Sequence, residues 1–253
     1  MLSIVIIGTG NLAEHLLDAF LPKEALKVVQ VVGRSQVSLA PFKRKVPTTT
    51  DFLNIADADL YLLAVSDDAI RDVSERLSHK DGLATHISGS VPLQEIQHKR
   101  RGVFYPVQSF TKGKPIDFKE VPICLEAESK TDLELLRLLA GSVSETIHEM
   151  HSEQRQYLHL AAVFANNFTN HLYHLAREIC DGRNIPFDVL RPLIGETARK
   201  IQSMSPYDAQ TGPARRQDRG TLEKHGSLLE EQNHKTMYKR LSESIQKTYA
   251  KEL

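Results

Sequence analysis

Residue types that would mark a secreted, metal-binding or membrane-spanning protein are scarce in this sequence. Its 253 residues contain no tryptophan and only two cysteines, Cys124 and Cys180. Neither cysteine belongs to a C-x-x-C motif or a Cys/His ligand pattern, so we expect no metal site and two buried, reduced thiols. No apolar run approaches the ~20 residues of a membrane helix, and no basic leader precedes the first apolar segment. The sequence therefore predicts a soluble, cytoplasmic protein.

An excess of charge of either sign is also absent. The 32 Lys and Arg residues balance 32 Asp and Glu residues, so no net charge attracts nucleic acid or an anionic membrane. The short basic runs at residues 43–45 and 99–101 are expected on the solvated surface. Hydrophobic residues make up 41% of the chain, enough for a substantial core. These features favour a globular protein whose partner is a small molecule.

The clearest pattern is at the start of the chain, MLSIVIIGTGNLA. Residues 3–7 are a β-branched apolar run typical of a strand buried on both faces, and a G-x-G-x-x-A motif follows at once. In such a motif Gly8 allows the tight turn, Gly10 lets the backbone approach a pyrophosphate, and the small Ala13 lets the helix pack on the strand. The phosphates then bind N–H groups at the helix start. The predicted contacts with the cofactor at this turn are Gly8, Thr9, Gly10, Asn11 and Leu12.

A second predicted strand, residues 27–32, ends in Gly33, Arg34 and Ser35. This is where the ribose of the adenosine half is expected. An acidic residue there would favour NAD, whereas Arg34 and Ser35 offer donors to a 2′-phosphate and so favour NADP. The alternative is that Arg34 is an ordinary exposed loop arginine.

Up to about residue 150, apolar runs alternate with helical patterns, which predicts a mostly parallel, doubly wound α/β sheet in a Rossmann domain over residues 1–150. Strands are predicted at residues 3–7, 27–32, 60–65, 83–87, 103–105, 121–125 and 143–148, and helical connections at 48–52, 68–77 and 131–140. The ligand of such a sheet crosses the carboxyl ends of its strands. There, Val65, Ser66 and Ser88 are expected to lie near the nicotinamide; alternatively they are simple turn residues.

Residues 151–253 are predicted to form an all-helical second domain. One helix of about 30 residues is expected from 151 to 180, capped by Ser152 and ended at Gly182. At 100° per residue, His159, Asn166 and Asn170 fall on one line of this otherwise apolar helix, with His174 alongside. These polar groups could tie the helix to its neighbours, or could face the cofactor and contact the substrate.

The rest of this domain contains two further helices and an unusual loop. Pro186 is expected to start a helix, and Pro192 should either kink this helix or mark its true first turn. An amphipathic helix is predicted over residues 235–250. Between them, residues 210–218 place Arg215 and Arg216 among turn formers, followed by a capping aspartate for a helix over 221–229. Either arginine could bind a substrate carboxylate or phosphate, or could pair with surface carboxylates.

Five segments together resemble the Rossmann-like proteins that carry the C-terminal domain of unknown function 2520. They are the G-x-G-x-x-A start, Arg34-Ser35, YPVQSF at 105–110, HLAAVFANNFTNH at 159–171 and TGPARRQD at 211–218. That family is similar in layout to pyrroline-5-carboxylate reductase, the 6-phosphogluconate and 3-hydroxyisobutyrate dehydrogenases, and the deazaflavin-dependent NADP reductases. The resemblance implies an NADP domain, a helical second domain, and a homodimer in which the long helices pack together.

The sequence departs from the hydroxyacid dehydrogenases at one important position. Those enzymes place a catalytic lysine one turn before an asparagine on the first long helix. Here the residues one turn before Asn166, Asn167 and Asn170 are Ala162, Val163 and Asn166. The missing lysine weakens the case for their alcohol-oxidising chemistry.

Two hypotheses for function follow. The first is a reductase that transfers hydride from NADPH to a small carbonyl or imine, with His159 as proton donor, Asn166 and Asn170 as hydrogen-bonding partners of the substrate, and Arg216 as the anchor of an acidic group. The second is a regulator that senses NADP without turning it over. A methyltransferase is less favoured because Arg34 stands where such an enzyme usually has an acidic ribose-binding residue.

Overall fold

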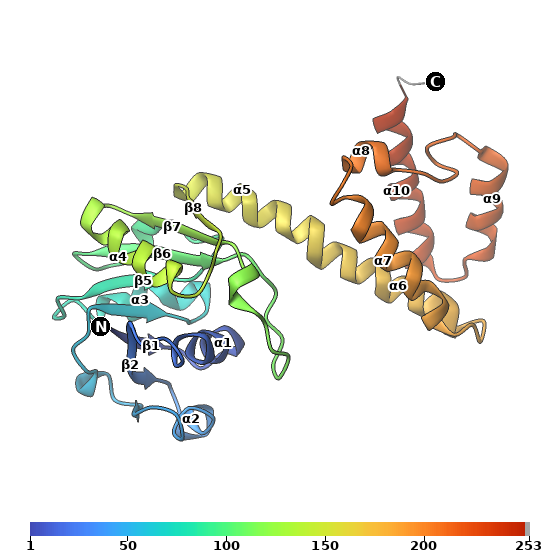
Figure 1. Cartoon of the computed structure of the whole chain (residues 1–253). Coiled ribbons are helices and arrows are strands. Elements are labelled where there is room, and N and C mark those ends of the chain that lie inside the picture. Colours follow the sequence, from blue (N-terminus) through green and yellow to red (C-terminus); the bar gives the residue numbers. More distant parts are fainter. Residues whose placement is uncertain (251–253) are drawn as a thin grey trace. The chain divides into compact units, whose positions relative to one another are not determined.

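A computed structural model describes residues 1–250 of the chain (Figure 1). It contains two compact units, Met1–Asn166 and the residues from Asn167 onward. The sequence placed the domain division at residue 150, where the strands end. The compact unit extends further because the helix after the last strand packs on the sheet. The last three residues of the predicted domain 151–253 lie outside the described residues.

The first unit is built on one eight-stranded sheet in the order β3-β2-β1-β4-β5-β6-β7-β8, which confirms the predicted Rossmann-type α/β architecture. All neighbours pair in parallel except β6 and β7, which are antiparallel. The strands are β1 (Leu2–Ile7), β2 (Leu26–Val32), β3 (Thr48–Thr49), β4 (Leu60–Leu63), β5 (Leu83–His86), β6 (Arg101–Pro106), β7 (Ile123–Ala127) and β8 (Ile147–Glu149).

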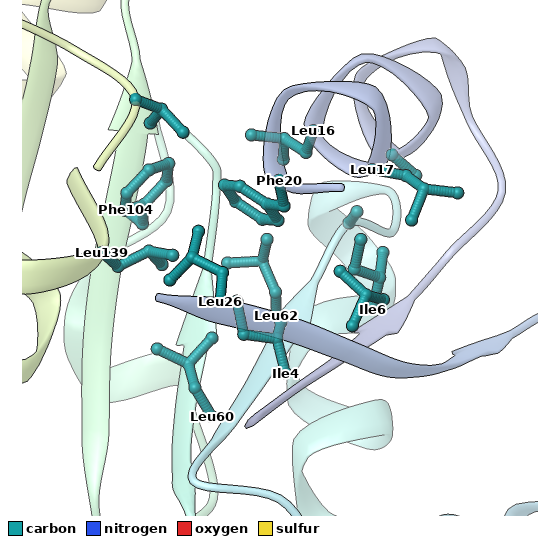
Figure 2. Close-up of a cluster of buried hydrophobic side chains, with 14 of the residues drawn as sticks. Ile4, Ile6, Leu16, Leu17, Phe20, Leu26, Leu60, Leu62, Phe104 and Leu139 are labelled. Carbon is teal, nitrogen blue, oxygen red and sulfur yellow. The ribbon is translucent and has the colours of Figure 1, made fainter. Parts of the chain in front are cut away.

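Helices cover both faces of this sheet, because alternate residues of a strand point to opposite sides. On one face, Ile4 and Ile6 of β1 pack with residues of α1 (Asn11–Phe20) and α4 (Lys130–Gly141). Figure 2 shows Leu16, Leu17 and Phe20 of α1 in this cluster. On the other face, Val5 and Ile7 pack with α3 (Ile70–Glu75). Each fully buried aliphatic side chain contributes about 1.5–3 kcal/mol.

Two predictions in this unit are wrong in detail. Residues 48–52 were expected to be helical, but Thr48 and Thr49 form strand β3 beside Val31 and Val32, since β-branched residues suit a pleated edge. A 3-10 turn (Phe52–Asn54) follows. Residues 143–148 were expected to be a strand, but only Ile147–Glu149 pairs with β7. Val143 and Ser144 instead close the turn after α4.

Helical residues continue from Ser152 to Asp181, but as three elements rather than one. They are α5 (Ser152–Ala162), a π-helical segment (Val163–Phe168) and α6 (Thr169–Asp181). The wider π turn advances each residue by less than 100°, so the polar line calculated for an ideal α-helix does not hold across it. The predicted cap is also wrong: His151 is the N-cap and forms a capping box with Gln154. Ser152 is the first helical residue.

The second unit is all-helical, as predicted. After α6 a 3-10 turn leads to α7 (Arg191–Lys200), with Pro192 in its first turn. Asp218 caps the next long helix by accepting from the Thr221 N–H at 3.0 Å, which confirms the predicted cap. The remaining helices are α2 (Gln36–Leu39) in the first unit and α8 (Pro206–Ala209), α9 (Arg219–Leu228) and α10 (Gln232–Tyr249) in the second. Within residues 1–250, no helix combines the length and apolar character needed to cross a bilayer.

Candidate functional site

A cavity of about 600 Å³ lies over the carboxyl ends of β1, β2, β4 and β5. Nine of the ten predicted cofactor contacts line it, namely Gly8, Thr9, Gly10, Asn11, Leu12, Arg34, Val65, Ser66 and Ser88. The tenth, Ser35, is not among the lining residues. Its hydroxyl caps α2 by accepting from the Ser38 N–H at 3.2 Å. The sequence therefore located the cavity correctly, although which cofactor atoms these residues contact stays a prediction.

The two motif glycines are needed for different reasons. Gly8 has φ +129°, and a Cβ there would lie 2.0 Å from the carbonyl oxygen of Ala64, so only glycine lets β1 turn this close to β4. Gly10 has φ −76° and a Cβ there would meet no atom within 4 Å. The space in front of Gly10 is open, at the start of a helix whose first N–H groups have no intrahelical acceptor. This opening fits a pyrophosphate.

The adenosine end of the cavity is bounded by Arg34 and Phe52. Arg34 is exposed at the end of β2, and Phe52 carries the guanidinium of Arg76 over its ring at 5.0 Å. Gly33 keeps this corner compact, because a Cβ there would lie 2.7 Å from Cγ2 of Thr9. A cationic group at this position fits a 2′-phosphate rather than a bare ribose.

The segment after β5, residues 87–93, contributes Ile87 and Ser88 to the cavity lining and is held by α5. Four hydrogen bonds join them: Arg155 Nε to the Ser88 carbonyl (3.2 Å), Arg155 Nη2 to the Val91 carbonyl, Gln156 Nε2 to the Ser90 carbonyl (2.8 Å), and the Leu93 N–H to Ser152 Oγ (2.9 Å). The first turns of α5 thereby fix a wall of the cavity. The polar residues 152, 155, 156 and 159 recur at helical spacing, which indicates a polar face of this helix but does not say which segment it contacts.

Arg155 is the residue on which this attachment depends. Its side chain is 1% exposed and forms an ion pair with Glu126 of β7. Glu126 also accepts from the Ser152 N–H at 3.0 Å and from the Ser152 hydroxyl. A buried charge is tolerated only when it is paired and hydrogen-bonded in this way.

His86, at the end of β5, is buried beneath the same loop. Burial, with a smaller contribution from the Arg155 charge, lowers its pKa to about 3. Nδ1 of the neutral ring accepts from the Ser88 N–H at 3.1 Å. At ordinary pH this histidine supports Ser88 and is not a source of protons.

His159 on α5 lies beside this wall. Its Nδ1 is 3.1 Å from the hydroxyl of Tyr105 at the end of β6. A Cβ at Gly89 would lie 2.7 Å from both His159 Nδ1 and Tyr105 Cζ. Gly89 directly follows Ser88, which lines the cavity. The predicted proton donor is therefore next to the cavity wall, and no pattern in the sequence indicates its contact with Tyr105.

Comparison with known proteins identifies the family. Residues 3–90 match the family described as NADP oxidoreductase, coenzyme F420-dependent, and residues 121–245 match domain of unknown function 2520. A Bacteroides fragilis protein provisionally described as an NADP oxidoreductase is 40% identical, with a TM-score of 0.90 over 97% of this chain and 98% of its own. This chain belongs to the Rossmann-fold NADP oxidoreductases that carry domain 2520. The predicted resemblance is thereby confirmed.

More distant structures share the fold of this NADP oxidoreductase family. The pyrroline carboxylate reductase of Plasmodium falciparum with NADP bound is 13% identical, with a TM-score of 0.59 over 98% of this chain and 97% of its own. An imine reductase of Myxococcus stipitatus in complex with NAD+ is 16% identical, with a TM-score of 0.62 over 98% and 94%. No curated protein matches the chain.

The remaining predicted substrate contacts of this oxidoreductase are divided between the two units. His159 and Asn166 belong to the first unit, and Asn170 and Arg216 to the second. Asn166 lies in the π-helical segment, a feature that recurs at functional sites. Arg216 is exposed, whereas Arg215 donates to the Gln210 carbonyl and lies 4.7 Å above the Tyr249 ring. Of the two arginines, Arg216 is the better candidate for binding an acidic group of the substrate.

Proposed function

We propose that this protein is an NADP-dependent reductase that transfers a hydride from NADPH to a small carbonyl or imine substrate bearing an acidic group. The observation that carries the proposal is the open space in front of Gly10, at a helix start and in a cavity that also contains Arg34. NADPH supplies the hydride when it is bound.

The residues of the cavity have distinct roles in this proposal. N–H groups at the start of α1 bind the pyrophosphate, and the guanidinium of Arg34 binds the 2′-phosphate. Val65, Ser66 and Ser88 lie against the nicotinamide half. These contacts hold the reacting carbons close together, which is most of what hydride transfer requires from a protein.

The substrate contacts are assigned to side chains of the helical stretch 152–181 and of the loop at residues 210–218. His159 gives a proton to the substrate oxygen or nitrogen as the hydride adds to carbon. Asn166 hydrogen-bonds the polar group of the substrate; in the second unit, Asn170 is assigned a hydrogen bond to the substrate and Arg216 its carboxylate. The relatives described as imine and pyrroline carboxylate reductases support an imine as the electrophile.

The proposal is tested by following NADPH absorbance with a panel of small carbonyl and imine acids. We choose 1-pyrroline-5-carboxylate as the acidic imine and 1-pyrroline as its analogue without a carboxylate. The expected result is turnover of an acidic substrate, its loss in His159→Ala, and an increase in KM for the acid but not the analogue in Arg216→Ala. Turnover that is unchanged in His159→Ala would remove the assigned proton donor.

The coenzyme preference has its own test. Arg34→Ser removes charge-assisted hydrogen bonds worth about 1.5–3 kcal/mol, so the affinity for NADPH should fall by roughly 10- to 150-fold. The affinity for NADH, which has no 2′-phosphate, should stay nearly the same. Calorimetric titration of both coenzymes measures the difference, and equal losses for the two would refute the role of Arg34.

The proposal extends to a homodimer in the cytoplasm. Apolar side chains of the long helix are exposed in the single chain, with Tyr157 at 68%, Leu160 at 51% and Ile179 at 44%. A second copy packing on these residues would remove them from water. Sedimentation of Leu160→Glu, with Leu53→Glu as a control at another exposed leucine, tests this interface. The two free, buried cysteines support a reducing compartment.

A second candidate function is a sensor that binds NADP without turnover. Ala162, Val163 and Asn166 stand where the dehydrogenases would have their lysine, and the absence of that lysine fits a sensor as well as it fits a reductase. Tight binding of NADPH combined with no consumption across the whole panel would select the sensor over the reductase.

A further inference from the structure

Tyr105 and His159 come from elements far apart in the sequence and meet beside the cavity. Tyr105 is 9% exposed at the end of β6, and its hydroxyl is 3.1 Å from Nδ1 of His159. The two rings are 6.0 Å apart at an interplanar angle of 74°, an edge-on arrangement. Arg155, one turn earlier on α5, is locked to β7 and to the loop after β5. Both rings are therefore attached to rigid elements.

The contact decides which imidazole nitrogen remains available. A tyrosine hydroxyl can both donate and accept a hydrogen bond. Burial raises the pKa of Tyr105, so the phenol keeps its proton at ordinary pH. The hydroxyl can donate to Nδ1 of a neutral ring or accept from an Nδ1–H, and it accepts from the Nδ1–H of an imidazolium. In both states Nδ1 is engaged and Nε2 is left for another partner.

Gly89 provides the space in which the two rings meet. Any Cβ at this position would be 2.7 Å from Tyr105 Cζ and 2.7 Å from His159 Nδ1, at the point where the rings approach each other. The neighbouring residue, Ser88, lines the cavity. The geometry thus ties the orientation of the imidazole to the loop that forms the cavity wall.

We infer that Tyr105 is a positioning residue, whose hydroxyl holds His159 with Nε2 as the nitrogen that donates the proton to the substrate. The inference rests on the proposed reductase function. NADPH, when bound, would supply the hydride that reduces the substrate carbon, and would lose its C–H bond and become NADP+. The Nε2–H bond of the imidazolium breaks, its proton moves to the substrate oxygen or nitrogen, and His159 is left neutral. Tyr105 itself does not touch the substrate.

The decisive experiment observes His159 without any substrate. In full-length protein labelled with nitrogen-15 at its 11 histidines, His159 is assigned by comparison with His159→Gln. At a pH where the ring is neutral, we expect the proton on Nε2 and an Nδ1 signal shifted as for a hydrogen-bonded acceptor. Tyr105→Phe should move Nδ1 to the position of an unbonded nitrogen. Gly89→Ala, which keeps both side chains but separates them, should move it in the same direction.

A matched control is present in the second unit. The Tyr238 hydroxyl is 2.9 Å from Nδ1 of His225, so Tyr238→Phe removes the same kind of contact from another pair. It should change the His225 signals and leave those of His159 unchanged. A proton on Nδ1 of His159 in the wild-type protein, or an Nδ1 signal unaffected by Tyr105→Phe, would overturn the inference.

Turnover provides a second readout. With 1-pyrroline-5-carboxylate, Tyr105→Phe should lower kcat by about 10- to 100-fold, because a misplaced proton donor loses much of its general-acid contribution. The Kd for NADPH should stay within about twofold of wild type, since Tyr105 is not among the residues lining the cavity. Absence of turnover in the wild type with the nitrogen signals as expected would count against the reductase function alone. Normal turnover in Tyr105→Phe would count against the positioning role alone.

Discussion

Alanine at each of the two motif glycines should separate folding from cofactor binding. Gly8 and Gly10 are two residues apart, yet the structure gives them opposite surroundings. A Cβ at position 8 would lie 2.0 Å from the Ala64 carbonyl oxygen, on backbone with φ +129°. A Cβ at position 10 would lie in open space, on backbone with φ −76°. Gly8→Ala should therefore destabilise the fold, while Gly10→Ala should leave it intact and block the pyrophosphate.

The magnitudes can be worked from these surroundings. A non-glycine residue in such a left-handed conformation costs of order 1–3 kcal/mol, and the clash with Ala64 adds a shift of β1 against β4. With about 2–4 °C per kcal/mol for a protein of this size, Gly8→Ala should lower Tm by roughly 6 °C or more. At Gly10, a loss of up to about 1 kcal/mol at the helix N-cap is offset by a gain of about 0.4–1 kcal/mol from a less flexible unfolded chain. Its Tm should change little.

The affinity for NADPH should fall in Gly10→Ala, although this variant keeps its stability. If the methyl group of Gly10→Ala prevents two charge-assisted hydrogen bonds to the pyrophosphate, about 3 kcal/mol or more is lost, which is at least ~100-fold in Kd. Thermal unfolding measures the first effect and calorimetric titration of NADPH the second. Wild-type affinity in Gly10→Ala, or wild-type Tm in Gly8→Ala, would refute the assignment of roles within the glycine turn.

Three further predictions concern buried polar groups. The unfolded chain protonates His86 near pH 6.5 but the folded state only near its pKa of about 3. Stability should therefore rise with pH across this window, by up to ~1.4 kcal/mol per unit, and His86→Asn should reduce this dependence in urea titrations at several pH values. Cys124 is 1% exposed, and this burial raises the pKa of its thiol to about 11. Mass spectrometry should therefore find Cys124 unalkylated by iodoacetamide at neutral pH until the protein is unfolded. Arg155→Met leaves Glu126, whose side chain is 12% exposed, without its cation. The free energy of unfolding measured by chemical denaturation should fall by about 3–5 kcal/mol, with partial recovery in Arg155→Met/Glu126→Gln. A loss below about 1 kcal/mol would show that this ion pair is not what attaches α5.

Much of the cofactor half could be predicted because its signals are local in the sequence. A buried apolar run, a G-x-G-x-x-A turn and a helix pattern occupy consecutive residues, so the chain specifies them without distant partners. The same holds for Asp218, whose side chain reaches an N–H group only three residues away. Arg34 could be placed in the cavity because the carboxyl ends of parallel strands must lie at one edge of the sheet.

The predictions that were wrong or missing concern features that depend on residues distant in the sequence. Thr48 and Thr49 form a strand because they pair with the edge of β2. Ser152 is not the N-cap, because its hydroxyl donates to Glu126. The periodicity of an ideal helix could not foresee a π-helical segment, since that depends on how the chain is held on either side.

What the sequence by itself determined is the nucleotide-binding half, including the place of Arg34 at its cavity, because each element there is encoded by neighbouring residues. Only the tertiary structure could decide the surroundings of His159. Tyr105 and His159 are 54 positions apart, and Ser88 and Arg155 are 67 positions apart. Contacts over such distances depend on the packing of α5 against the sheet, which no local pattern of residues specifies.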